Sequence, residues 1–400
     1  MNNIDYNATT LKLMGLVEAN PRLKELLCKA IAKGKAVNPD AATNPVQTLE
    51  QYFDFVDRSQ KSMPWDVICC PGLPTVFGRM YQALCYCYFI NCMPLEELEG
   101  GSLFTSSLQY VEPYRSWLTD YCKSWGTFLS SPESWNKEYE KLMEQQEELG
   151  MTRGWYEDPS AWKSFNDFFA RHLKSPDCRP VAFPDDDGIV ISPADCMPQG
   201  TWDIDEESRI VTDEKIAVKS RVFNSVRNLI TPESPYCDAF AGGVFYHAFL
   251  NANDYHRYHF PVGGIVRELR IIPGDVALGG AVTWEPELQQ YVVDCNVPGW
   301  QSIEARGLAI IETERHGLVA AMPIGMSQVS SVNFEAELKV GDRVKKGDLL
   351  GYFLFGGSDF VIVFQQKAAF ELLAPKEADG GYQHIFMGEM LGTMSGEFAL

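Results

Sequence analysis

The sequence predicts an α+β fold in which a helical N-terminal domain, residues 1–150, precedes a mainly β domain, residues 151–400. Apolar residues recur at helical spacing in the first 150 residues, where strand-like alternation is scarce. After about residue 185, short runs rich in Val, Ile, Tyr and Phe alternate with Gly, Pro and Asp. The composition, 46% hydrophobic and 22% charged over 400 residues, is that of a globular protein with a sizeable core.

The N-terminal part is predicted to form helices because its apolar side chains repeat on one face of a 3.6-residue spiral. The repeating positions are Leu11, Leu13, Met14, Leu23, Leu26, Leu27, Tyr52, Phe53, Phe55 and Val56. The clearest helix is predicted over residues 132–149, with Ser131 as its N-cap, Pro132 at its first position and Gly150 at its end.

The most apolar segment, residues 84–90, is closed by Asn91 and Pro94. It is much shorter than the roughly 20 residues that a membrane span needs, so it is predicted to be a buried helix. Three cysteines lie in or beside it, at positions 85, 87 and 92. Since no fourth ligand follows at a comparable spacing, we expect buried structural cysteines there and no metal site.

The C-terminal part is predicted to be β because strand-like runs are separated by turn residues. The runs are GIVISPAD, GGVFYHAFL, GGIVRELRIIPGD and YVVDCNVPGW. Turn clusters are expected at Pro273-Gly274-Asp275, at Gly341-Asp342 and at Gly347-Asp348. No internal repeat is evident, which argues against solenoids and repeat arrays.

The charge balance restricts the partners of this protein. There are 34 basic and 54 acidic residues, giving a net charge of −20 at pH 7. Such a chain repels phosphate backbones and anionic lipid headgroups, so we expect no nucleic-acid partner and no stable membrane anchor. The 11 cysteines are an odd number at low density, and no signal-peptide pattern leads the chain. A reducing, cytoplasmic location is therefore expected.

Four local groups contain residues that could carry chemistry. Gly356-Gly357-Ser358 is set between two apolar runs, where it is either a tight turn or a Gly-Ser peptide whose hydroxyl can reach the preceding carbonyl. Asp195 closes the run Ser192-Pro193-Ala194-Asp195 and is either a turn residue or the acid that orients a histidine. The aromatic segment 164–171, followed by Arg179, is typical of helix packing and serves as a landmark.

His256 and His259 are two of the six histidines in the chain. A spacing of three places them on one face of a helix or on opposite faces of a strand. A metal pair, satisfied structural histidines and acid–base residues are all compatible with this pattern. Asp195, His259 and Ser358 have the side chains of an activated serine, although the sequence does not show that they meet.

Taken in order, these groups resemble the phosphatidylserine decarboxylase family of pyruvoyl enzymes over roughly residues 160–370. The matching segments are SFNDFFARHLK, CRPV, ISPAD, DYHRYHFPVGGIVRELRIIPGD and KKGDLLGYFLFGGSDFVIVF. The helical region, in PGLPTVFGRMYQAL and KSWGTFLSSPES, resembles more loosely the accessory domain of the soluble fungal-type branch that includes L-tryptophan decarboxylase.

The resemblance implies that the chain cleaves itself between Gly357 and Ser358. Ser358, deprotonated by His259 with Asp195 behind it, attacks the Gly357 carbonyl, and the resulting ester is lost by β-elimination. Ser358 thereby becomes a pyruvoyl group, and the long and short chains stay associated. His256 is the implied proton donor in turnover. We expect the Gly357–Ser358 bond to lie between two strands.

The implied reaction is decarboxylation of a small-molecule amino acid through a Schiff base to the pyruvoyl group. No pyridoxal phosphate and no metal are then expected. Resemblance to the tryptophan decarboxylase branch favours a soluble, aromatic L-amino acid; the alternative is phosphatidylserine decarboxylation on a phospholipid. The family's usual Leu-Gly-Ser-Thr is replaced here by Gly356-Gly357-Ser358-Asp359, and Cys196 follows Asp195 where the family prefers glycine.

Two further readings compete with an active decarboxylase. The segment 340–348 resembles biotinyl or lipoyl carrier domains, but it lacks the Met-Lys or Asp-Lys context of the modified lysine. A family member that no longer processes itself could serve a structural or regulatory role. The retained Asp195, His256, His259 and Ser358 argue against that reading.

Overall fold

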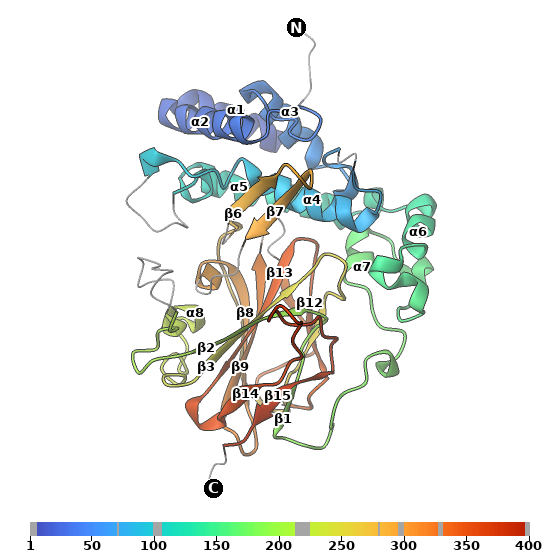
Figure 1. Cartoon of the computed structure of the whole chain (residues 1–400), viewed down its shortest axis with the longest axis vertical. Coiled ribbons are helices and arrows are strands. Elements are labelled where there is room, and N and C mark those ends of the chain that lie inside the picture. Colours follow the sequence, from blue (N-terminus) through green and yellow to red (C-terminus); the bar gives the residue numbers. More distant parts are fainter. Residues whose placement is uncertain are drawn as a thin grey trace.

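A computed structural model describes residues 6–69, 72–98, 106–212, 225–278, 281–294, 300–326 and 331–396. Helices gather at the N-terminal end of the molecule and strands at the other (Figure 1). The predicted α+β class, with N-terminal helices and a mainly β C-terminal part, is confirmed.

The helices begin at residues suited to cap them. Asn7, Asn20, Thr48 and Thr75 each accept a hydrogen bond from a backbone N–H in the first turn of the helix that follows. The helices are α1 (Ala8–Ala19), α2 (Pro21–Val37), α3 (Leu49–Ser59), α4 (Val76–Phe89), α5 (Tyr114–Leu129), α6 (Lys137–Glu144), α7 (Phe165–Phe169) and α8 (Val226–Ile230). Helix α4 contains most of the apolar segment 84–90, and Cys85 and Cys87 are buried in it, as predicted.

The prediction of a single helix over residues 132–149 was wrong. The segment forms a 3₁₀ turn, helix α6 and a second 3₁₀ turn, and Asn136 caps α6 in place of Ser131. The break occurs at Trp135, which is extended and whose ring stacks on that of Phe168 at a centroid distance of 5.5 Å. Burial of this indole outweighs the local helix signal. Gly150 does end the segment, in a left-handed conformation with φ 69°.

The strands follow the runs read from the sequence. They are β1 (Ile189–Ile191), β2 (Met197–Asp203), β3 (Val244–Leu250), β4 (Arg257–His259), β5 (Gly264–Ile272), β6 (Ala281–Glu285), β7 (Gln290–Asp294), β8 (Ala305–Glu312), β9 (Leu318–Met326), β10 (Val332–Phe334), β11 (Arg343–Val344), β12 (Leu349–Phe353), β13 (Gly357–Phe364), β14 (Phe370–Leu372) and β15 (Met390–Met394). The predicted turn clusters lie where strands end or begin, and the carboxylates of Asp342 and Asp348 accept backbone N–H groups there.

A seven-stranded antiparallel sheet forms the centre of the β part. Its order is β11-β5-β8-β9-β13-β3-β2, so β13 is an interior strand paired with β9 and β3. Smaller sheets have the orders β10-β12-β4, β1-β15-β14 and β6-β7. Because β13 is flanked on both sides and covered on both faces, its apolar residues from Phe360 to Phe364 are fully buried.

The two faces of β13 belong to two hydrophobic cores. Val361 and Val363 join a cluster that extends through the N-terminal helices, whereas Phe360 and Ile362 join a cluster confined to the β part. The hairpin β6-β7 also packs on α4, where the Tyr291 ring lies 4.7 Å from that of Phe89 (Figure 1). The helical and β parts therefore share a core, and the domain boundary near residue 150 stays a prediction.

Candidate active site

Gly357 and Ser358 are the first two residues of the interior strand β13, whereas we had expected their bond to lie between two strands. Ser358 pairs with Leu250 on one side and Gly325 on the other. The strand begins this early because β9 extends far enough to pair with Gly357 and β3 far enough to pair with Ser358. Ser358 is 1% exposed, and its Oγ has no hydrogen-bond partner among the described residues. A buried hydroxyl held in this way is free to act as a nucleophile.

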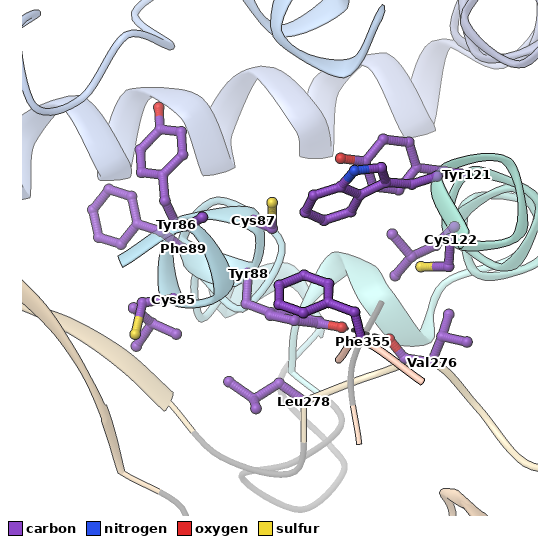
Figure 2. Packing of buried hydrophobic residues seen from close by; sticks show 14 of the residues in the cluster. Cys85, Tyr86, Cys87, Tyr88, Phe89, Tyr121, Cys122, Val276, Leu278 and Phe355 are labelled. Carbon is purple, nitrogen blue, oxygen red and sulfur yellow. Dashed lines mark hydrogen bonds between the residues drawn. The ribbon is translucent and has the colours of Figure 1, made fainter. Parts of the chain in front are cut away.

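The residues just before this bond are held by the helical region. The Phe355 backbone N–H donates to Asn166 Oδ1 at 3.0 Å. The Phe355 ring lies 5.6 Å from the ring of Trp125 and 5.3 Å from those of Phe165 and Phe169. Figure 2 shows Phe355 among side chains of α4 and α5. The Gly357–Ser358 bond is therefore the first bond of the paired strand β13 and follows shortly after Phe355, which is anchored among aromatic rings.

The two histidines are carried on or beside β4, which pairs with β12, the strand that leads into the cleavage segment. His259 Nδ1 lies 2.8 Å from the Gly347 carbonyl, which only accepts, so Nδ1 carries the proton. Nε2 then accepts from the Tyr255 hydroxyl at 3.2 Å. Burial lowers the pKa of His259 to about 4, so the imidazole is neutral at pH 7.

His256 is fully buried, with its ring 3.9 Å from the Phe169 ring. Its Nδ1 faces the Asp254 carbonyl at 3.4 Å, and its Nε2 has no partner. Burial, together with the nearby charge of Arg171, lowers the pKa of His256 well below its usual value. His256 therefore offers a neutral imidazole with an unoccupied nitrogen, in contrast to His259, whose two nitrogens are both engaged.

Asp195 is held by Arg179 and not by a histidine. Arg179 donates to both carboxylate oxygens, at 2.9 and 2.6 Å, and the Met387 backbone N–H adds a third bond. Asp195 is close enough for its charge to raise the pKa of His259 against the effect of burial. No hydrogen bonds link Asp195, His259 and Ser358 into one chain, so the roles assigned to these three residues stay predictions.

Several functional candidates were missed from the sequence. Tyr255 occupies His259 Nε2, and Asp254 bonds His384 at 2.8 Å. On the other face of β13, Asp359 bonds His247 at 2.8 Å. Asp359 was visible as a departure from the family motif, but His247 lies in an ordinary strand run and gave no signal.

A small apolar cavity of about 30 Å³ adjoins the cleavage segment. It is lined by Tyr81, Leu84, Cys85 and Tyr88 of α4, by Phe249, Leu250 and Ala252 at the end of β3, and by Leu278, Val293 and Gly356. Leu250 is the cross-strand partner of Ser358, and Gly356 stands two residues before it. The cavity therefore lies beside the backbone of residue 358.

Two other features of the described residues bear on ligands. A second, open and polar cavity of about 870 Å³ reaches Asp195, Asp254 and His384 from the outside. In the described ranges there is no group of three or more His, Cys, Asp or Glu side chains arranged to hold a metal ion. Ser358 itself fits a self-generated prosthetic group, because it follows a glycine, is buried and has an unpartnered hydroxyl.

Comparison with known proteins gives a consistent picture. The family model for phosphatidylserine decarboxylase matches residues 165–393. Phosphatidylserine decarboxylase proenzyme 2 of Oryza sativa is 34% identical over 61% of this chain, which spans about a third (36%) of the rice protein. Decarboxylase iboD of Amanita muscaria is 29% identical over 68% of this chain and 81% of its own length. The phosphatidylserine decarboxylase proenzyme of Fusobacterium nucleatum is 28% identical over 70% and 84%.

None of the helices in the described ranges is both long enough and apolar enough to span a bilayer.

Proposed function

The chain belongs to the phosphatidylserine decarboxylase family, and from that premise we propose that it is a self-processing, pyruvoyl-dependent decarboxylase of a free amino acid. The observation that carries the proposal is Ser358, whose buried hydroxyl has no partner and follows directly on Gly357. Its strand is paired on both sides, and the preceding Phe355 is anchored in the helical core. This arrangement supports intramolecular attack, because the Ser358 hydroxyl and the Gly357 carbonyl are both held in place and shielded from water.

Maturation proceeds as an acyl shift followed by an elimination. Ser358 Oγ bonds to the Gly357 carbonyl carbon, and the Gly357–Ser358 C–N bond breaks to leave an ester. Loss of the Ser358 α-proton then expels the ester oxygen with its electron pair, and hydrolysis of the dehydroalanine releases ammonia. Neutral His259 accepts the hydroxyl proton, with Asp195 stabilising the charge that forms. The Tyr255 hydroxyl donates to His259 Nε2, so it either relays the Ser358 proton to that nitrogen or moves aside before the transfer.

The pyruvoyl group supplies a carbonyl for the substrate amine and takes up the electron pair released with CO₂. The protein supplies the proton that replaces CO₂, and we assign this to His256. Its unoccupied Nε2 supports the assignment, because a neutral buried imidazole can take up a proton and return it to the α-carbon.

The two products of cleavage stay together in this proposal. Strand β13 begins with the short chain and is paired on both sides with strands of the long chain, β3 and β9. Strand β15 of the short chain pairs with β1 of the long chain. Cutting one peptide bond at the end of β13 leaves these ladders and the buried apolar residues from Phe360 to Phe364 intact.

A free, apolar or aromatic amino acid is the substrate favoured by the cavity beside residue 358. Its walls are apolar and aromatic and come from α4 of the helical region, so the helices cover one side of the site. Walls of this chemistry suit the side chain of an apolar or aromatic amino acid. The net charge of −20 points the same way, because it disfavours anionic lipid surfaces.

Intact mass of the denatured protein tests the proposal. Freshly purified protein should contain two chains that meet at the 357–358 bond, the smaller one beginning with a pyruvoyl group, whereas the Ser358→Ala variant should remain one chain. CO₂ release should then occur with free aromatic amino acids and not with phosphatidylserine vesicles. A wild-type chain that stays uncut on long incubation would overturn the proposal, and activity confined to vesicles would replace the amino acid by the lipid.

A further inference from the structure

A group of polar side chains is buried on the face of β13 opposite Ser358. Successive residues of a strand point to opposite faces, so Asp359 turns toward the helical region while Ser358 turns away from it. Asp359 Oδ2 lies 2.8 Å from His247 Nε2, and both side chains are 0% exposed. Glu304 is also fully buried and follows the turn that carries Trp300, whose ring contacts the His247 ring. We call Asp359, His247 and Glu304 the acid cluster.

The acid cluster is short of hydrogen-bond partners. Asp359 Oδ1, His247 Nδ1 and both carboxyl oxygens of Glu304 have none among the described residues. Unpaired polar atoms at complete burial are costly, and native proteins retain few of them. Burial raises the pKa of Asp359 and of Glu304, and the charge of Asp359 further raises that of Glu304. The unpaired atoms therefore point to a ligand that completes the group.

The missing partner is a donor that carries positive charge. Three of the four unpaired atoms are carboxyl oxygens, and the neighbouring cations are committed elsewhere. Arg306 donates to the backbone carbonyls of residues 228, 229 and 304, and Arg115 pairs with Asp275. An ammonium group has three N–H donors and no acceptor, so it complements such a site.

We propose that the acid cluster receives the amino group of the substrate as its ammonium ion, one residue from the pyruvoyl position. This inference rests on the proposed function, which brings an amine to residue 358. Asp359 directly follows that residue, and the pyruvoyl keto carbon is the former Cα of Ser358, a backbone atom between the two faces, so an amine bonded to Asp359 Oδ1 can approach it. Transfer of one proton from nitrogen to Oδ1 breaks an N–H bond, forms an O–H bond and leaves the amine with the free electron pair that condensation requires.

The same geometry orients the rest of the substrate. Phe249, directly opposite Asp359 on the neighbouring strand, lines the apolar cavity. Leu278, also in the cavity wall, is bonded through its backbone to Gln109 of the helical region. With its amino group at Asp359, an amino acid directs its side chain into that cavity. The acid cluster and the cavity together select an amine with an apolar or aromatic side chain.

Two inhibitors of equal size separate this proposal from a structural role for the cluster. Tryptamine carries the ammonium group, and tryptophol carries a neutral hydroxyl in its place. In the matured wild-type enzyme, tryptamine should compete with the amino acid more strongly than tryptophol. Asp359→Asn removes the charge but keeps the size, so it should weaken inhibition by tryptamine and raise KM at least about tenfold, with tryptophol inhibition unchanged. Glu268→Gln, a partly buried carboxyl paired with Arg270 on β5, is the matched control.

The outcomes are distinguishable from failure of the proposed function, because wild-type cleavage and CO₂ release are measured first. Equal loss of tryptamine and tryptophol inhibition in Asp359→Asn, or no loss of either, would overturn the acid-cluster proposal and leave the decarboxylase intact. Should Asp359→Asn fail to fold or to cleave, Glu304→Gln serves as the second variant with the same comparison. For a third readout, tryptamine should stabilise the uncut Ser358→Ala protein against heating more than tryptophol does, and equal stabilisation would contradict the proposal.

Discussion

The two faces of strand β13 carry polar groups that burial affects in opposite directions. The sheet containing β4 packs on the Ser358 face, where the Tyr258 ring contacts the Phe360 ring at 5.7 Å. On or beside β4, the buried His256 and His259 have lowered pKa values and are neutral bases, and the His256 ring packs on Phe169 of the helical region. On the Asp359 face, burial raises the pKa of the carboxyls.

The opposite pKa shifts show that one strand can adjoin two kinds of chemistry. Desolvation disfavours charge of either sign, so it lowers the pKa of buried histidines and raises the pKa of buried carboxyls. The histidines are then neutral bases, and the carboxyls ionise more readily when a cation binds beside them. The alternation of side chains along β13 keeps these two environments apart while they share the backbone of residue 358.

Replacing the histidines should separate maturation from turnover. We expect His259→Ala to slow cleavage by about 100-fold or more, because the hydroxyl proton loses its acceptor. His256→Ala should cleave normally and lose turnover by a similar factor. Cleavage is followed by intact mass and turnover by CO₂ release from pre-cleaved protein. A His256→Ala variant that cleaves normally and keeps full turnover would remove the role assigned to His256.

Replacing Arg179 should destabilise the surroundings of Asp195 and leave the acid cluster unchanged. Arg179→Ala leaves Asp195 buried with one remaining hydrogen bond, from the Met387 N–H. Loss of one partner of a buried ion pair costs about 3–5 kcal/mol of folding free energy. Denaturant unfolding of the Ser358→Ala protein with and without Arg179→Ala measures this without interference from cleavage. A loss below about 1 kcal/mol would mean that Asp195 has another partner.

Truncating Phe355 should loosen the anchor that both faces share. Phe355→Ala removes a fully buried ring from among Trp125, Phe165 and Phe169, and such changes cost about 3–5 kcal/mol. Cleavage should also slow, since the Gly357 carbonyl is less firmly held. Leu288→Ala, at a position 62% exposed, is the control and should change neither quantity. Unchanged cleavage in a stably folded Phe355→Ala variant would show that the anchor does not position the bond.

The two faces should respond to pH with opposite sign. His259 has a folded-state pKa of about 4 against a usual 6.5, so its contribution to stability is lost as the pH falls from about 6.5 to 4. Cleavage should fall only as the pH approaches about 4, where His259 in the folded protein becomes protonated. Glu304 has a raised pKa, so its contribution is present below its ordinary 4.5 and is lost as the pH rises.

Glu304→Gln sharpens this contrast with a small effect. The groups whose charges act on Glu304 are Asp275, Asp359 and Arg306, and a neutral amide removes the cost of ionising among them. Without ligand, the variant should melt a few degrees higher than wild type at pH 8 and equally at pH 5. Thermal melts at the two pH values measure it. A variant that is less stable at pH 8 would mean that the Glu304 carboxylate has a stabilising partner.

The sequence alone determined the α+β class, the strands in the runs that it singled out, the turn clusters and the group of residues that the family resemblance indicated. These features depend on neighbours along the chain. Runs of strand-forming residues bounded by glycine or proline indicated β3 and β5. Asp342 and Asp348 marked turns through bonds to nearby backbone, and the adjacent glycines drew attention to Ser358. The helix over 132–149 failed because Trp135 packs on Phe168, a residue beyond the segment.

The tertiary structure decided which groups meet. Asp195 binds Arg179 and leaves His259 to Tyr255 and Gly347, although all the side chains were present in the sequence. Asp359 finds His247 across 112 residues, and the cavity joins α4 to the end of β3. Hydrogen-bond partners, burial and the resulting pKa values depend on distances between segments far apart in the chain. Local pattern contains no information about those distances, so only the folded molecule could supply them.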